Sequence, residues 1–112
     1  MTSIRLVYVI KYVADMDRAV RFHRDTLGLP LKFQSPFWTE FSTGDITLAL
    51  HPASDRNPPG HCQLGFRTDG LSDLYANRDE RGLVFAAPPA EQRGALIARF
   101  LDSEGAECSV SG

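Results

Sequence analysis

The same order of secondary-structure elements occurs twice along the 112 residues, and this internal repeat constrains the fold most strongly. In each half, a strand-like run precedes apolar residues at helical spacing, and three shorter strand-like runs follow. Met16 and Leu71 are 55 positions apart, and so are Ala19 and Leu74. Two such units are expected to expose one apolar sheet face each and to bury these faces jointly.

The first half, residues 4–51, predicts a βαβββ module. Its β-branched and aromatic run 6–10 is typical of a strand. Asp15 is expected to cap a helix that starts at Met16 and ends at Gly28, because glycine readily adopts the left-handed terminal conformation. Turn residues then separate three predicted strands, at 31–34, 37–42 and 46–51.

The second half, residues 61–111, predicts the same module after a proline-rich linker at 52–60. Asp69 is expected to cap a helix that ends at Gly82, and a loop is expected around Pro88, Pro89 and Gly94. The predicted strands are 62–67, 83–85, 95–101 and 106–110. We therefore expect a single α+β domain of two βαβββ modules that form a cupped mixed sheet.

Composition narrows the possible partners. The formal net charge is −2 with 12 basic and 14 acidic residues, and no basic stripe suits nucleic acid. No run approaches the roughly 20 apolar residues that span a bilayer, and the first residues lack a signal-peptide pattern, so we expect a cytoplasmic location and no membrane. Cys62 and Cys108 are expected to be buried free thiols.

Two motifs resemble those of the vicinal oxygen chelate superfamily, which includes glyoxalase I, bleomycin-resistance proteins and extradiol dioxygenases. Residues 13–19, Phe22 and residues 25–29 resemble its opening module, and residues 99–105 resemble its closing turn. The resemblance covers nearly the whole chain. It implies the paired βαβββ fold, a small-molecule cup between the modules and a homodimer.

The resemblance also implies where a divalent metal would bind. Enzymes of this superfamily use His, Glu or Gln ligands from the first and last strands of each module. The corresponding positions here are Tyr8, Ala49, Gln63 and Ser109. Only Gln63 is an ordinary ligand, so we expect no metal cofactor at the usual positions.

A displaced metal site is the alternative. Residues two apart on a strand share a face, so His51, His61 and Glu107 point to the same faces as the usual ligand positions. Their chemistry suits zinc, iron or nickel. A shift of two residues is about 6.6 Å, however, which far exceeds the tolerance of a coordination sphere. His51 and His61 are otherwise expected at the rim, and His23 is expected to pack half-buried on the first helix.

The cup is expected to bind a small molecule between aromatic walls. Glu40 or Glu107 would suit a cation, and Arg99 would suit a carboxylate or phosphate. Alternatively, the rings fill the core and Glu40 pairs with Arg99. Strand alternation predicts this cup-facing set: Tyr8, Ile10, Tyr12, Trp38, Glu40, Thr47, Ala49, His51, Gln63, Ile97, Arg99, Glu107 and Ser109.

Three functions follow as hypotheses. The first is a non-catalytic small-molecule-binding protein similar to the bleomycin-resistance branch. The second is a lyase, isomerase or dioxygenase, of glyoxalase-like or extradiol type, that uses the displaced metal site. The third is a structural or regulatory dimer without a small ligand. No motif assigns a catalytic residue.

Overall fold

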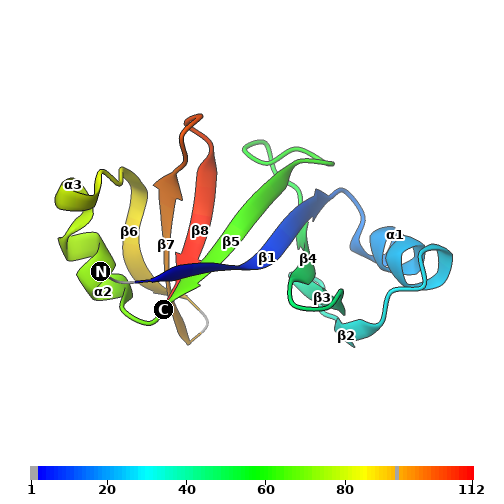
Figure 1. The fold of residues 1–112 in the computed structure, drawn as a ribbon. Helices are drawn as coiled ribbons and strands as arrows, with labels where there is room; N and C mark the ends of the chain where they lie inside the picture. The colour runs from blue at the N-terminus through cyan, green and yellow to red at the C-terminus, as the bar shows by residue number, and fades with distance from the viewer. Residues whose placement is uncertain (1–2, 93) are drawn as a thin grey trace. The chain divides into compact units, whose positions relative to one another are not determined.

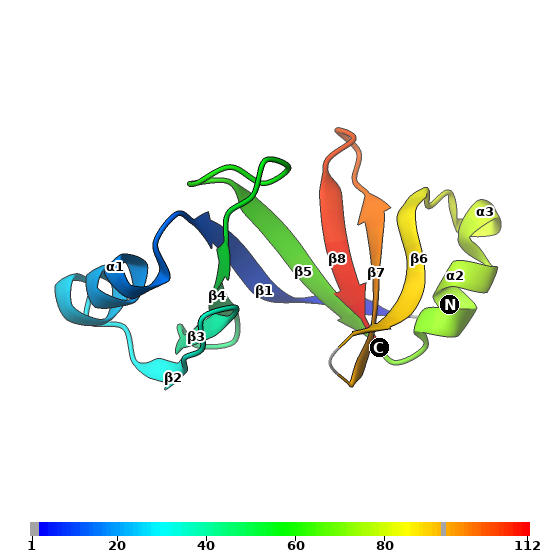
Figure 2. The ribbon, with the colours of Figure 1, turned by 180° about the vertical axis from the view of Figure 1, so that it is seen from behind.

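The computed structural model describes residues 3–92 and 94–112. It combines strands with short helices, shown from opposite sides in Figure 1 and Figure 2. This arrangement confirms the predicted α+β class. Among the described residues, none of the helices is long and apolar enough to cross a membrane.

The chain divides into two compact units. We call Val7–Gln63 the N-terminal unit, and Leu64–Gly112 with the described residues up to Leu6 the C-terminal unit. The boundary cuts two strands, β1 (Ile4–Val13) after Leu6 and β5 (Cys62–Thr68) after Gln63. Each of these strands therefore contributes residues to both units.

In the N-terminal unit the strands lie in the order β2-β3-β4-β1. β1 is parallel to β4, whereas β3 is antiparallel to both β2 and β4. Parallel neighbours need a long crossover, and the segment from the helix to β3 supplies it. The elements after β1 are α1 (Met16–Arg21), the π-helix η1 (Phe22–Thr26), β2 (Leu31–Phe33), β3 (Thr39–Ser42) and β4 (Thr47–Pro52).

The C-terminal unit repeats this topology with the order β6-β7-β8-β5. β5 is parallel to β8, and β7 is antiparallel to β6 and β8. The repeat predicted from the sequence is confirmed, and α1 and α2 begin at the paired positions Met16 and Leu71. The elements after β5 are α2 (Leu71–Ala76), α3 (Arg78–Arg81), β6 (Phe85–Gln92), β7 (Ala95–Leu101) and β8 (Glu107–Ser111).

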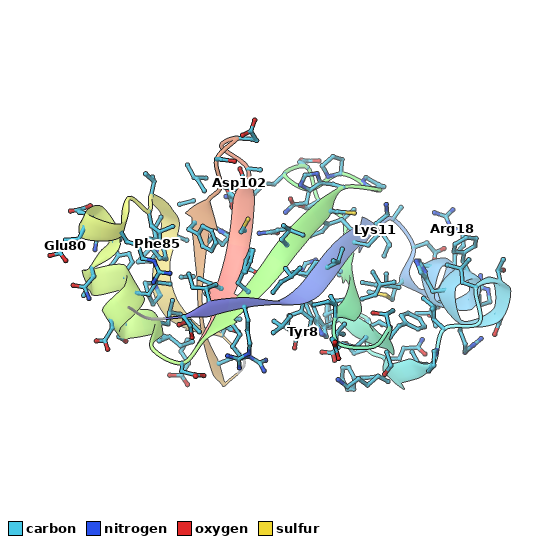
Figure 3. The ribbon with its side chains drawn as sticks, in the orientation of Figure 1. Tyr8, Lys11, Arg18, Glu80, Phe85 and Asp102 are labelled. Carbon is cyan, nitrogen blue, oxygen red and sulfur yellow. The ribbon has the colours of Figure 1, made fainter. Side chains whose placement is uncertain are left out.

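Each unit buries one face of its strands under its own helix. In the N-terminal unit, Val20 of α1 packs with Phe41 and Leu50, and all three are at most 2% exposed. In the C-terminal unit, the buried cluster joins α2 to alternate residues of β7 and β8: Leu71, Leu74, Ala98, Phe100, Cys108 and Val110. Phe85 of β6 lies against Tyr75 of α2 with ring centroids 4.9 Å apart (Figure 3).

The two helices begin differently. The Asp15 carboxylate accepts a hydrogen bond from the Arg18 amide at 3.0 Å, which confirms the predicted cap of α1. The predicted Asp69 cap is wrong, because the N-cap of α2 is Gly70 and makes no side-chain hydrogen bond. Asp69 instead forms an exposed ion pair with Arg5 at 3.7 Å.

The sequence predicts one continuous helix in each half, and neither helical segment is a single α-helix. The first continues from α1 into the π-helix, where the Leu27 amide bonds to the Phe22 carbonyl. The second is interrupted at Asn77 between α2 and α3. Both segments still end at the predicted glycines, Gly28 and Gly82, whose φ angles of 72° and 77° are left-handed.

The loop predicted around Pro88, Pro89 and Gly94 is wrong for the two prolines, because both lie inside β6, whereas Gly94 lies in the turn before β7. Proline lacks an amide donor and is tolerated only at edges and bulges of a sheet. β6 satisfies both conditions, since it is the last strand of its unit and its register with β7 shifts twice.

Candidate functional site

The strands of the N-terminal unit carry a second apolar cluster on the face away from α1. Ile10, Tyr12 and Ala49 are buried, and Tyr8, Trp38 and Ala53 pack against them. The register explains this grouping, because Ile10 lies opposite Ala49, which in turn lies opposite Glu40. Glu40 and His51 lie beside this cluster. We use the name aromatic face for seven residues: Tyr8, Ile10, Tyr12, Trp38, Glu40, Ala49 and His51.

Ring contacts organise the aromatic face. Trp38 meets Tyr8 edge-on at 5.6 Å and His51 edge-on at 6.2 Å between ring centroids. The His51 ring also lies 5.2 Å from Tyr12. Edge-to-face contacts of this kind are worth roughly 0.5–1.5 kcal/mol beyond the burial of the rings. Tyr8 and Trp38 remain half-buried, so their outer surfaces are accessible. Tyr8 is labelled on β1 in Figure 3.

Glu40 orients the indole of Trp38. Its Oε2 accepts a hydrogen bond from Trp38 Nε1 at 2.7 Å, and its Oε1 lies 3.7 Å from Lys32 Nζ. The Glu40 side chain is only 17% exposed, so its charge needs these partners. Glu40 and Arg99 belong to different units, so the sequence alternative in which they pair stays a prediction.

Tyr12 is held by residues of the linker and of β5. Its backbone amide donates to the His61 carbonyl at 2.9 Å, and its carbonyl accepts from the Gly60 amide at 2.9 Å. Its hydroxyl donates a hydrogen bond to Gln63 Oε1. The His61 ring stacks on Tyr12 at 5.9 Å. The proline-rich linker is thus fastened to β1 by hydrogen bonds.

The positions that correspond to the usual metal ligands do not fit a divalent ion. Ala49 has no donor atom and is 0% exposed within the aromatic face. The Gln63 oxygen accepts from Tyr12, and Tyr8 contacts Trp38. Ser109, the fourth position, belongs to the C-terminal unit and carries a neutral hydroxyl. One neutral amide oxygen and two hydroxyl groups are a poor donor set for such an ion.

In the C-terminal unit, the predicted site residues lie on the strand face away from α2. Arg99 is opposite Ser109, and Glu107 is opposite Leu101. Arg99 Nε lies 3.0 Å from Glu107 Oε1, with the side chains 38% and 29% exposed. The contact is an ion pair and not a hydrogen bond, because Arg99 Nε makes no hydrogen bond to the described residues.

The displaced metal set is divided between the units. His51 and His61 are exposed in the N-terminal unit, as expected for rim residues, whereas Glu107 lies in the C-terminal unit. Within residues 3–92 and 94–112, no group of three His, Cys, Asp or Glu side chains is placed to hold a metal ion. Each histidine contacts the Tyr12 ring. The displaced site stays a prediction.

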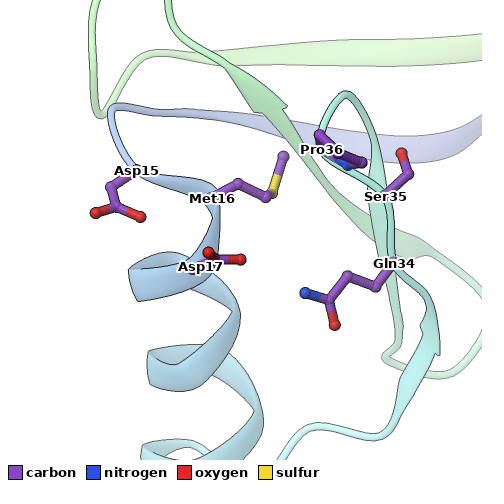
Figure 4. Close-up of a pocket in the computed structure, with 6 residues that line it drawn as sticks. All are labelled: Asp15, Met16, Asp17, Gln34, Ser35 and Pro36. Carbon is purple, nitrogen blue, oxygen red and sulfur yellow. The ribbon is translucent and has the colours of Figure 1, made fainter.

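A shallow groove of about 480 Å³ lies on the helix side of the N-terminal unit (Figure 4). Met16 and Gln34 point into it, whereas Asp15 points away from it. The Asp15 carboxylate is engaged as the α1 cap. Ser35, which lines the groove, hydrogen-bonds the backbone of Trp38 and so holds the turn that presents the indole. The lining residues are Asp15, Met16, Asp17, Gln34, Ser35 and Pro36.

His23 and Cys108 are placed as the sequence predicts, and Cys62 is not. His23 is half-buried between Phe22 and Phe41, as expected, with Nδ1 2.7 Å from the Ala19 carbonyl oxygen. Cys108 is buried as predicted, but Cys62 is exposed, so its predicted burial is wrong. Cys62 alternates with the buried Gln63 on β5, so its side chain points to the opposite, exposed side of the strand.

Sequence reasoning missed Lys32 as the partner of Glu40. The signal was available in principle, because opposite charges on neighbouring strands often pair. However, β2 and β3 shift register between Leu31 and Phe33, and such a shift is not visible in the sequence.

Comparison with known proteins identifies relatives by family and by fold. The family model described as Glyoxalase/Bleomycin resistance protein/Dioxygenase superfamily matches residues 5–108. No curated protein sequence gives a significant match. This family match confirms the resemblance derived from the sequence motifs.

Solved structures show the same fold. Methylmalonyl-CoA epimerase from Mycobacterium tuberculosis has a TM-score of 0.77 at 19% identity, covering 95% of this chain and 85% of that one. A glyoxalase/bleomycin resistance protein/dioxygenase superfamily member from Vibrio splendidus 12B01 has a TM-score of 0.66 at 16% identity, covering 97% and 98%. The Mn(II)-bound glyoxalase from Novosphingobium aromaticivorans has a TM-score of 0.67 at 22% identity, covering 99% and 40%. At these identities the likeness confirms the predicted fold and carries no statement about function.

Proposed function

Because the chain belongs to the glyoxalase/bleomycin resistance protein/dioxygenase superfamily, we propose that it binds a small planar molecule without catalysing a reaction on it. The aromatic face of the N-terminal unit is the proposed contact surface. The observation that carries this proposal is the orientation of Trp38 by Glu40, with Tyr8 beside it. Small-molecule sites are lined mainly by apolar and aromatic side chains with a few polar groups, and the aromatic face has this composition.

The ligand positions support binding over metal-dependent catalysis. Ala49 offers no donor, and the Gln63 oxygen is engaged by Tyr12. A metal-dependent lyase, isomerase or dioxygenase would need His51, His61 and Glu107 instead. We rank that alternative second, because Glu107 already pairs with Arg99 within its own unit.

Two measurements test the proposed function. A thermal-shift screen of planar aromatic compounds should find ligands that raise the melting temperature, since a ligand at 100 times its Kd adds about 2.7 kcal/mol. Because Trp38 is the single tryptophan, its fluorescence should change over the same concentration range. Elemental analysis that finds one tightly bound transition metal per purified chain, lost in His51→Ala, would contradict the proposal in favour of the enzyme.

We also propose that the protein is a homodimer, as the family resemblance implies. Exposed large apolar residues concentrate in the N-terminal unit, where Phe22, Phe33 and Phe37 are 49%, 54% and 58% exposed. A second copy of the chain that covered these rings would remove apolar surface from water. Light scattering should give twice the 12.4 kDa chain mass. A monomer at micromolar concentration would refute the dimer without affecting the ligand proposal.

A further inference from the structure

We propose that the molecule bound at the aromatic face is an uncharged planar aromatic compound. This inference rests on the proposed function and adds the charge of the ligand to it. It follows from the partners of the three predicted ligand contacts that carry a carboxylate or guanidinium group: Glu40, Arg99 and Glu107.

Glu40 is not available as a counter-charge for a cationic ligand. One carboxylate oxygen accepts from the Trp38 indole at 2.7 Å, and the other faces Lys32 at 3.7 Å. A cation that approached Glu40 would have to compete with Lys32 and would disturb the hydrogen bond that orients the indole. The arrangement makes Glu40 a positioning residue for Trp38.

The charged residues of the C-terminal unit are also paired with each other. Arg99 and Glu107 are 3.0 Å apart, so each neutralises the other. An anionic ligand would meet a guanidinium whose charge Glu107 already offsets, and a cation would meet a carboxylate whose charge Arg99 already offsets. Each of the three charged contacts is therefore paired inside its own unit.

An uncharged aromatic ligand gains most binding free energy from the ring surfaces of the aromatic face. The outer surfaces of Tyr8 and Trp38 offer stacking and edge contacts, which depend on ring geometry rather than on net charge. A charged ligand would lose part of its hydration against these rings. The one carboxylate of the aromatic face, Glu40, is already paired with Lys32 and Trp38. The balance between these effects favours the neutral form of one ring system over its charged forms.

Three probes that share one ring isolate the effect of charge. 2-Naphthalenemethanol is neutral, 2-naphthylmethylammonium is cationic and 2-naphthoate is anionic at pH 7. Equilibrium dialysis against the full chain should give a Kd for the alcohol at least tenfold lower than for either ion. Trp38→Ala, checked for folding by circular dichroism, should weaken binding of the alcohol at least tenfold and so place it at the aromatic face.

Lys32→Gln sharpens the test, because it removes the counter-charge of Glu40. The affinity ratio of the cationic to the neutral probe should then rise about tenfold. Arg21→Gln is the matched control, since Arg21 is an exposed cation on α1 in the same unit. It should leave the ratio within twofold of the original.

The outcomes separate the two proposals. Tightest binding of the alcohol, dependent on Trp38, supports both. Tightest binding of the ammonium or of the naphthoate, again dependent on Trp38, overturns the uncharged ligand and leaves the proposed function standing. No saturable binding of any probe, or binding indifferent to Trp38→Ala, overturns the aromatic face as a binding site and with it both proposals.

Discussion

The two units share one topology, yet they place different chemistry on the strand face away from their helices. The N-terminal unit places Tyr8, Tyr12 and Trp38 there, whereas the C-terminal unit places the Arg99–Glu107 ion pair. Their helix-covered faces, in contrast, are equivalent buried clusters. The repeat therefore specifies a scaffold, and the outer faces of its strands are where the halves have diverged.

The helix-covered faces should respond alike to loss of a core side chain. Leu50 and Leu74 are 0% and 1% exposed, and each is expected to cost about 2–5 kcal/mol of unfolding free energy when replaced by alanine. Chemical denaturation measures both. Leu27→Ala is the control, because Leu27 is 53% exposed and should change stability by less than about 0.5 kcal/mol. A large loss in only one unit would break the equivalence of the two cores.

The two cysteines should differ in alkylation rate by about a hundredfold. Cys62 is exposed, whereas Cys108 is 3% exposed, and burial raises the pKa of its thiol. A raised pKa leaves less of the reactive thiolate at a given pH, and burial also blocks the reagent. Mass spectrometry after brief iodoacetamide treatment should show one adduct on the native chain and two after denaturation. Two adducts at equal rates on the native protein would contradict the burial of Cys108.

A substitution on the aromatic face should weaken binding of the neutral probe, whereas a substitution in the C-terminal unit should not. Trp38→Phe keeps a ring but removes the indole N–H that Glu40 accepts, so we expect binding of the neutral probe to weaken about threefold to tenfold. The control Val84→Ala changes an exposed apolar residue of the other unit, 62% exposed, and should have no effect on the Kd. An unchanged Kd for Trp38→Phe would show that the orientation of the indole does not matter.

The smallest contrast concerns the two helix starts. Asp15→Ala removes a side-chain cap and should cost about 1 kcal/mol of stability. Asp69→Ala, at the position where the cap was expected in the other half, should cost less than about 0.5 kcal/mol because its ion pair with Arg5 is exposed. Thermal unfolding of the two variants, measured side by side, checks the difference. Equal losses would mean that Asp69 has a role its exposed ion pair does not explain.

Local signals in the sequence predicted helix ends correctly where a residue type has one well-defined conformational role, such as an N-cap or a left-handed glycine. Asp15 caps α1, and Gly28 and Gly82 end their helical segments in the left-handed conformation, as expected. Local signals predicted the wrong secondary structure where the position of a segment in the sheet decides its conformation. Pro88 and Pro89 indicated a loop, but an edge strand with register shifts accommodates both.

The sequence by itself determined the repeated βαβββ order, the family and the absence of ordinary ligands at Ala49 and Ser109, because each depends on residue identity at a fixed spacing. Only the tertiary structure decided which charges meet. Lys32 reaches Glu40 through a register shift, and Arg99 reaches Glu107 across an antiparallel pair. Pairing depends on register, and a change of a single residue in register alters every partner across a strand.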